Sequence, residues 1–265
     1  MENKLKRANE YFGVSDDIYK KTGAFNPVIG VDSLFFVDTL LLSKTSVPEI
    51  KDGLQEIRKY FSDIIILLKS NSEKARQQAL GRLVLREVKG IGIGYGNASD
   101  DGSAIGPELA KRLLLTAEEL IKIGIDNPAI FEVMGLFEED FGPDRLSDGL
   151  IRILLKKLYK YSERVTGELS ISETFIQKTY EHNYTLAKHP LKNGPLIFIP
   201  NDILRDLPIA NNFDEISNLV NFNKELREKF NQIISPCFFV DNNKKKPSKS
   251  EIKKYLLEDK ERIKT

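Results

Sequence analysis

The stretch 134-MGLFEEDFGPDRLSDGLIRILLKK-157 joins an acidic segment to the start of a helix. Its acidic residues are Glu138, Glu139, Asp140, Asp144 and Asp148. A Gly-Pro pair at 142–143 interrupts the chain, and apolar residues then recur at helical spacing: Leu146, Leu150, Ile151, Leu154, Leu155 and Leu158. The pattern predicts a helix from Asp144 to about Arg164, with Asp144 as its capping residue.

The acidic residues of this stretch allow a catalytic and a structural interpretation. Asp144 and Asp148 are four positions apart, so they share a helix face, with Arg145 and Arg152 alongside. Two carboxylates on one face would bind a hard cation, or one would act as a base while an arginine holds an anion. The catalytic interpretation assigns Asp144, Asp148 and Arg145 to chemistry, and Glu138, Asp144 and Asp148 to a metal. In the structural interpretation, Asp144 caps the helix and Asp148 favours its dipole.

A second motif, Glu87-x-Lys89, has the form of the acid-x-lysine half of a restriction-type nuclease site. In such sites carboxylates hold Mg²⁺ and the lysine stabilises the nucleophile. The site also needs an upstream aspartate outside the predicted helices, which leaves Asp38 or Asp32. The alternative is a chance match, because 30% of the residues are charged.

The glycine-rich segment 90–106 precedes a predicted helix and offers a possible anion site. It contains neither the dinucleotide-binding fingerprint nor a P-loop. Glycines before a helix let backbone N–H groups converge on an anion, so Gly102, Ser103 and Gly106 are the candidate anion-binding residues. The alternative is a tight turn whose glycines supply positive φ, since Asp100 and Asp101 would repel a phosphate.

Other polar residues are interpreted as structural. Asp202, Arg205 and Asp206 are taken as one ordinary ion-paired group. His182 and His189 lie among tyrosines and lysines, with no serine elbow or nearby cysteine that would make either the base of a nucleophile. We therefore interpret both histidines as ordinary surface or core residues.

The pattern of apolar residues and breakers predicts an α+β fold: a mostly helical domain with a few short buried strands. The helices are expected at 47–69, 72–84, 107–123, 127–140 and 144–164, and helix is favoured over the ambiguous 170–188. Strands are expected within 28–42, 195–199 and 237–240, with a turn of helix following the second of these.

The domain is expected to cover residues 1–241. A lysine-rich linker follows at 242–250, and 251–265 is a charged helix that reads either as a frayed tail or as the start of a further domain.

Composition excludes several classes of protein. With 40 basic and 39 acidic residues the net charge is +1, so no overall field draws the chain to nucleic acid or anionic membranes. One cysteine and two histidines exclude an internal disulfide and a zinc site built from Cys and His alone. No apolar run approaches a membrane span, and no signal peptide is recognisable. We expect a cytoplasmic protein with no membrane partner.

Two segments, 135-GLFEEDFGPDRLSDGLIRIL-154 and 195-PLIFIPNDILRDLP-208, resemble a group of uncharacterised bacterial proteins found near phage-defence and restriction genes. Gly142, Pro143, Asp144, Leu146, Ser147 and Asp148 match the first motif of that group, and Pro200, Asp202 and Leu204 match the second. The resemblance implies that a restriction-endonuclease-like domain often follows at the C-terminus. Asn201 replaces a lysine, and Gly149, Leu150 and Ile151 replace polar positions, so any chemistry of those polar groups would be lost here.

Three functions follow as hypotheses. The first is a non-catalytic sensor or assembly module of a bacterial anti-phage defence system, acting with a nuclease or effector and binding nucleic acid or a phage component. The second is a metal-dependent nuclease or phosphoester hydrolase that uses the acidic cluster, for which Mg²⁺ is the expected cofactor. The third is a plain scaffold. The sequence leaves open whether the chain is an enzyme and whether it forms oligomers.

Overall fold

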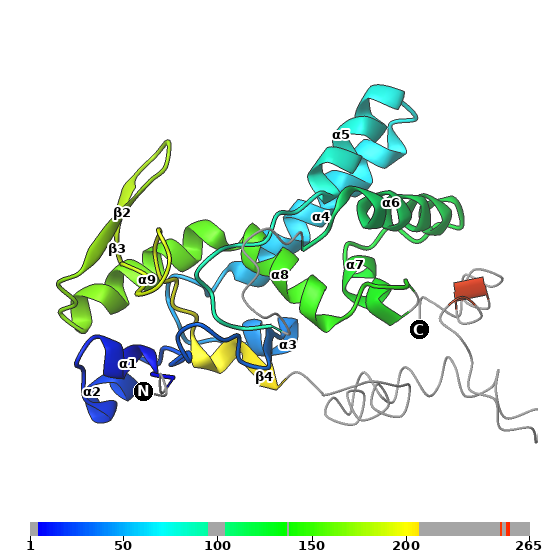
Figure 1. Cartoon of the computed structure of the whole chain (residues 1–265). Helices are drawn as coiled ribbons and strands as arrows, with labels where there is room; N and C mark the ends of the chain where they lie inside the picture. Colours follow the sequence, from blue (N-terminus) through cyan, green and yellow to red (C-terminus); the bar gives the residue numbers. More distant parts are fainter. Residues whose placement is uncertain (1–4, 95–103, 137, 207–249, 251–252, 255–265) are drawn as a thin grey trace, which may run out of the picture. The chain divides into compact units, whose positions relative to one another are not determined.

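Figure 1 shows a computed structural model of the chain, which describes residues 5–94, 104–136, 138–206, 250 and 253–254. The chain divides into two compact units. Unit 1 comprises residues 1–60, 85–105 and 144–207, and unit 2 comprises 61–84, 106–143 and 208–265. Helices dominate, and the short strands pair in two small antiparallel sheets, so the α+β prediction is confirmed. None of the helices in the described ranges is long and apolar enough to cross a membrane.

Unit 1 holds every strand among the described residues, together with most of the short helices. Its elements are α1 (Ala8–Tyr11), α2 (Asp16–Lys21), β1 (Phe35–Val37), α3 (Thr39–Leu42), the first part of α4 (Gly53–Lys69), α8 (Pro143–Ile153), α9 (Leu155–Glu168), β2 (Thr174–Lys178), β3 (Asn183–Ala187), η2 (Asn201–Ile203) and β4 (Leu204–Asp206). The first residue of α8, Pro143, is assigned to unit 2, and the rest of the helix from Asp144 onward belongs to unit 1.

The segment 170–188 forms a β-hairpin, so the prediction of a helix there is wrong. Strands β2 and β3 pair antiparallel from Thr174 opposite Ala187 to Lys178 opposite Asn183, and the hairpin lies along α9 (Figure 1). Burial alternates along both strands, with Tyr184 and Leu186 buried. This period of two is the signature of a strand with one covered face.

The segment 195–199 forms only an isolated bridge at Pro195, so the strand predicted there is wrong, and its backbone bonds to several separate partners. Ile197 N–H donates to the Gly90 carbonyl at 2.8 Å, and Phe198 N–H donates to Ser162 Oγ at 2.9 Å. The Ile199 carbonyl accepts from Phe25 N–H at 2.8 Å. The predicted turn of helix after it is η2.

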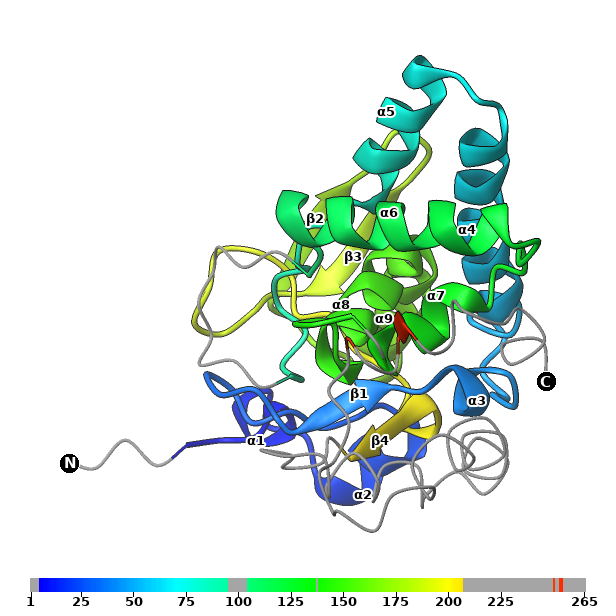
Figure 2. The same ribbon diagram turned by 90° about the vertical axis from the view of Figure 1, so that its right-hand side faces the viewer.

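Strand β1 pairs antiparallel with β4, and the two lie side by side in Figure 2. Of the segment 28–42, only 35–37 is strand, because Asp38 caps α3 by accepting a hydrogen bond from Leu40 N–H at 2.8 Å. Helix α4 begins at Gly53 rather than near Val47. The preceding residues form turns, in which Gly53 N–H donates to the Ile50 carbonyl.

Helix α8 begins at Pro143, so Asp144 occupies the second helical position and the prediction that it caps the helix is wrong. Proline suits the first position because it lacks an N–H that would otherwise be unsatisfied. The predicted single helix is interrupted at Leu154, which is the N-cap of α9. Within α8, Ser147 is 2% exposed, and its Oγ accepts from Val37 N–H at 2.9 Å. This bond fixes α8 against β1.

Unit 2 is helical in its described residues. It contains α4 from Phe61 onward, α5 (Glu73–Leu83), α6 (Pro107–Lys122), α7 (Ile130–Val133) and the 3-10 turn η1 (Met134–Leu136). Helices α4 and α5 run antiparallel in Figure 2, and α5 packs on α6, where Arg76 pairs with Glu118 at 2.6 Å.

The helix starts predicted in unit 2 are partly confirmed. Ser72 caps α5 by accepting from Ala75 N–H, and Pro107 is the first residue of α6. Helix α7 begins later than predicted, because Asn127 Oδ1 accepts from Ala129 N–H and forms a turn before it. The predicted strand at 237–240, Cys237, the linker before Ser250 and the tail after Lys254 lie outside the described residues.

We expect Ser147→Ala to lower the free energy of unfolding by ~1–3 kcal/mol, because the buried Val37 N–H loses its acceptor. Urea denaturation measures the change. The control is Ser172→Ala, an exposed serine of the same unit, for which we expect less than ~0.5 kcal/mol. Equal losses in the two variants would show that the Ser147–Val37 bond does not hold α8 in place.

Candidate functional site

A pocket in unit 1 brings together four of the charged residues that the sequence singled out, Asp32, Glu87, Lys89 and Asp148. Its polar lining comes from three segments far apart in the chain, together with α8: Asp32, Glu87, Lys89, Asp148, His189 and Lys192. The walls are apolar and include Ile29, Ile91 and Leu196, all buried. We call this the acidic pocket.

Gly90 brings the loop that carries Glu87 and Lys89 against the loop at 195. Its φ is +82°, and a Cβ there would lie 2.2 Å from the Pro195 carbonyl oxygen. Its own carbonyl accepts from Ile197 N–H at 2.8 Å. Only glycine allows this approach.

Ser33 pairs with the loop that carries Glu87 and Lys89, and so places its neighbour Asp32 beside that loop. Ser33 N–H donates to the Gly92 carbonyl at 3.0 Å, and Gly94 N–H donates to the Ser33 carbonyl at 2.9 Å. Gly92 and Gly94 have φ of +77° and +128°, and a Cβ on Gly94 would lie 3.0 Å from Asp144 Oδ1. The interpretation that the glycines supply positive φ is confirmed for Gly90, Gly92 and Gly94.

Asp148 lies among other carboxylates. Burial raises its pKa to about 8, with further increases from the charges of Asp144, Glu87 and Asp32, while Arg145 acts in the opposite direction. The pKa of Asp32 is also raised, first by burial and then by Asp144, against the lowering effect of Lys192. The four carboxylates therefore repel one another, and a cation in the acidic pocket would relieve that repulsion.

The side chains of the acidic pocket limit how a metal ion could be bound. Among the residues that the structure describes, no three His, Cys, Asp or Glu side chains lie close enough to hold one metal ion together. Mg²⁺ is commonly bound by one or two carboxylates, several waters and the phosphates of a substrate.

The predicted metal ligands are divided between the units. Asp144 and Asp148 belong to unit 1, whereas Glu138 belongs to unit 2, where its carboxylate accepts hydrogen bonds from Thr116 and Lys253. Arg145, the third predicted catalytic residue, is exposed on α8.

The predicted anion-binding loop is only partly described. Gly106 is the N-cap of α6, with extended φ and ψ of −75° and 171°. Gly102 and Ser103 lie outside the described residues, so the anion site stays a prediction.

His189 and Lys192 line the acidic pocket, although the sequence gave no reason to single out either as functional. His189 is 7% exposed, and its Nδ1 accepts from the backbone N–H groups of Leu191 and Lys192, both at 3.1 Å. An accepting Nδ1 places the proton of a neutral imidazole on Nε2. His182, in contrast, is exposed on the hairpin, 3.6 Å from Glu163.

Arg205 pairs with Asp38 rather than within the predicted group of Asp202, Arg205 and Asp206, but the contacts of Asp202 and Arg205 are structural. Asp202 accepts from Thr45 Oγ1 and from Ser46 N–H, and Arg205 pairs with Asp38, the cap of α3. Asp38 therefore has a structural role, and Asp32 is the upstream aspartate that lies beside Glu87 and Lys89.

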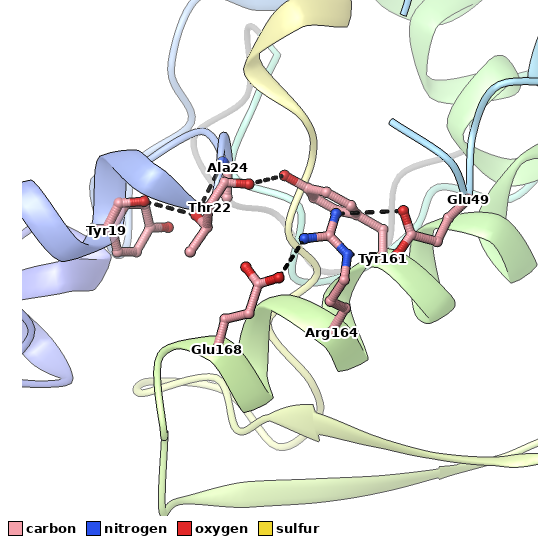
Figure 3. Close-up of polar contacts among 7 residues, drawn as sticks. All are labelled: Tyr19, Thr22, Ala24, Glu49, Tyr161, Arg164 and Glu168. Carbon is pink, nitrogen blue, oxygen red and sulfur yellow. Dashed lines mark hydrogen bonds and ion pairs between the residues drawn. The ribbon is translucent and has the colours of Figure 1, made fainter. Parts of the chain in front are cut away.

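Figure 3 shows a further polar cluster, on the face of α9 that meets the N-terminal helices. Arg164 pairs with Glu49 at 2.6 Å and with Glu168 at 2.7 Å, and the Tyr161 hydroxyl donates to the Thr22 carbonyl at 3.4 Å. Burial raises the pKa of Tyr161, so its phenol stays neutral. Each group has a partner within the cluster, which indicates a structural role.

The fold and the pocket define an α+β protein with a partly buried acidic site. The chain belongs to the family described as a domain of unknown function (DUF8370), which it matches over residues 13–212. That match spans the acidic pocket. No curated protein and no solved structure matches the chain.

We expect the stability of the wild type to fall as pH rises through the acidic range, relative to Asp148→Asn. The pKa of Asp148 is about 8 in the folded protein and 3.8 without its surroundings, so between these values the folded state retains a proton that the unfolded state has lost. The free energy of unfolding of the wild type should drop by ~2–5 kcal/mol relative to the variant from pH 4 to pH 8. Urea denaturation across that range is the measurement. The control is Asp206→Asn, because Asp206 is exposed on β4. If the free energy of unfolding changed with pH in parallel for the wild type and Asp148→Asn, that result would contradict the burial of Asp148 among carboxylates.

The Arg164 cluster should be a stabilising element. In a double-mutant cycle with Arg164→Met and Glu49→Gln, we expect a coupling energy of ~1–3 kcal/mol, because Glu49 is 17% exposed. The matched cycle with Glu168→Gln should give ~0.3–0.5 kcal/mol, since Glu168 is 43% exposed and four residues from Arg164. Thermal or urea denaturation measures both coupling energies. A larger coupling energy of Arg164 with Glu168 than with Glu49 would contradict the expectation that Glu49 is the stronger partner.

Proposed function

We propose that unit 1 is a Mg²⁺-dependent phosphoester hydrolase, with nucleic acid as the expected substrate class. The observation that supports the proposal is a convergence of two motifs. Glu87-x-Lys89 and the Asp144/Asp148 pair are more than fifty residues apart in sequence, and each alone is a weak signal. In unit 1 they lie together, with Asp32 as the upstream aspartate that the first motif requires.

The carboxylates would hold the cation. Asp148 and Asp144 are one helical turn apart on α8, and Asp32 and Glu87 face Asp148 closely enough to raise its pKa. One or two of these groups would bind Mg²⁺ directly, and the others would hold its waters. When bound, Mg²⁺ polarises a phosphoryl oxygen and makes a water more acidic.

The cations of the acidic pocket would hold the substrate. Lys89 and Lys192 line the pocket beside the carboxylates, and His189 Nε2–H adds a neutral donor. Ammonium groups stabilise the charge that develops on a phosphoryl group during its transfer. Without a metal the carboxylates would repel a phosphate, so substrate binding should require the cation.

The wider setting follows from the sequence resemblance. We propose that the chain works in the cytoplasm of a bacterium within an anti-phage defence system, alongside a nuclease or effector. A non-catalytic sensor would use the same pocket to bind a metal–phosphate ligand without turning it over.

The experiment is a calorimetric titration of Mg²⁺ and Mn²⁺ into the full chain, followed by cleavage assays on single-stranded and duplex oligonucleotides and on bis-p-nitrophenyl phosphate. The wild type should bind the metal and cleave at least one phosphodiester. The double variant Asp144→Asn/Asp148→Asn should lose both metal binding and cleavage. The control variant Asp206→Asn should keep both.

Lys89→Met separates the chemistry from the metal site. It should retain metal binding and lose turnover by ~10²-fold or more, because it removes a group that stabilises developing charge. Metal binding without any turnover in the wild type would support the sensor role. Absence of metal binding at millimolar concentration would contradict both roles and leave Asp144 and Asp148 as parts of a helix start.

A further inference from the structure

Unit 2 contains a buried carboxylate, that of Glu138. The Glu138 side chain is 6% exposed, and the Thr116 hydroxyl on α6 donates a hydrogen bond to it. Thr116 is itself fully buried, on the face of α6 that carries Leu113, Ala117 and Leu120. A carboxylate in apolar surroundings is costly unless charged or polar groups compensate it.

The backbone fixes Glu138 in this position from both sides. Its N–H donates at 2.8 Å to the carbonyl of Met134, the first residue of η1. One residue later, the Glu139 carbonyl accepts from Arg112 of α6 at 3.0 Å, and Arg112 also pairs with Asp140 at 3.1 Å. The turn is therefore tied to α6, which carries Thr116.

An ammonium group occupies the space in front of this carboxylate. Lys253 Nζ donates to Glu138 Oε1 at 2.7 Å and to Thr116 Oγ1, and it lies 3.8 Å from Glu119 Oε2. The hydroxyl of Thr116 accepts from the ammonium and donates to the carboxylate, so the donors and acceptors agree. Thr116 and Glu119 are three positions apart on α6 and share a face.

We propose that Thr116, Glu119 and Glu138 form a lysine-binding site in unit 2, the lysine socket, and that its occupant is Lys253 of the same chain. The ligand class is a primary ammonium, a compact cation with three donors that fits three converging oxygens. Occupation of the lysine socket attaches Lys253, which follows the lysine-rich segment 244–246 in sequence, to α6 and Glu138. The inference shares no residue with the acidic pocket and does not depend on the proposed hydrolase.

Amine-reactivity mapping of the full chain tests the proposal, with acetylation of each lysine followed by mass spectrometry. Lys254 is the internal reference, because it is exposed and adjacent to Lys253 in the same helical stretch. Lys253 should react at least about fivefold more slowly than Lys254, since a hydrogen-bonded ammonium reacts only after it leaves its site.

Glu138→Gln should reduce this difference to less than about twofold, because the amide lacks the charge that holds the ammonium. Thr116→Val should reduce it partly, without leaving a charge unpaired. Glu139→Gln is the matched control, an adjacent and exposed acid whose side chain is outside the socket, and it should leave the protection unchanged. Circular dichroism confirms that each variant is folded.

Three results would overturn the proposal. The first is equal reactivity of Lys253 and Lys254 in the wild type, which would show that the ammonium is not held. The second is full protection of Lys253 in both folded Glu138→Gln and folded Thr116→Val, which would show that other groups protect it. Protection that disappears on dilution of the wild type would assign the occupant to a second copy of the chain and contradict the intramolecular assignment.

Discussion

Mutual repulsion among carboxylates is the constraint on which the account of unit 1 depends. Asp148 is half-buried and within electrostatic reach of Asp144, Glu87 and Asp32, and its pKa rises accordingly. Such an arrangement weakens the folded state at neutral pH unless something compensates the charge. Carboxylates with raised pKa values are concentrated at functional sites, and in the proposed function a hard cation with a phosphate ligand would compensate these carboxylates and use the neighbouring lysines.

Specific residues hold the carboxylates of the acidic pocket close together. Ser147 bonds to β1 and so positions the turn of α8 that carries Asp144 and Asp148. Gly90 allows the Glu87–Lys89 loop to pass within van der Waals reach of the Pro195 carbonyl. Because Ser147 and Asp148 are adjacent, neighbouring positions of one helix carry a structural contact and the carboxylate to which we assign the proposed chemistry.

The sequence predicted the long helices and the fold class, because caps, prolines and apolar periodicity act locally. It predicted neither the hairpin at 170–188, where helix and strand patterns compete over short runs, nor the break at Leu154. It named Asp32, Glu87, Lys89, Asp144 and Asp148 as candidates, but as separate motifs. Their convergence depends on tertiary packing, as do the positions of His189 and Lys192, which no motif marks. The partner of Glu138 lies more than a hundred residues away, so no local pattern could have shown it.

The central claim is that the acidic pocket is a site for a divalent cation together with a phosphate ester. The most direct measurement is anomalous diffraction at the manganese edge from crystals of the full chain grown with Mn²⁺ and a phosphorothioate dinucleotide. The account predicts a manganese peak ~2.0–2.5 Å from a carboxylate oxygen of Asp144 or Asp148, with the phosphorothioate between it and Lys89 or Lys192. A manganese peak at other residues would contradict the central claim. So would the absence of any detectable manganese peak.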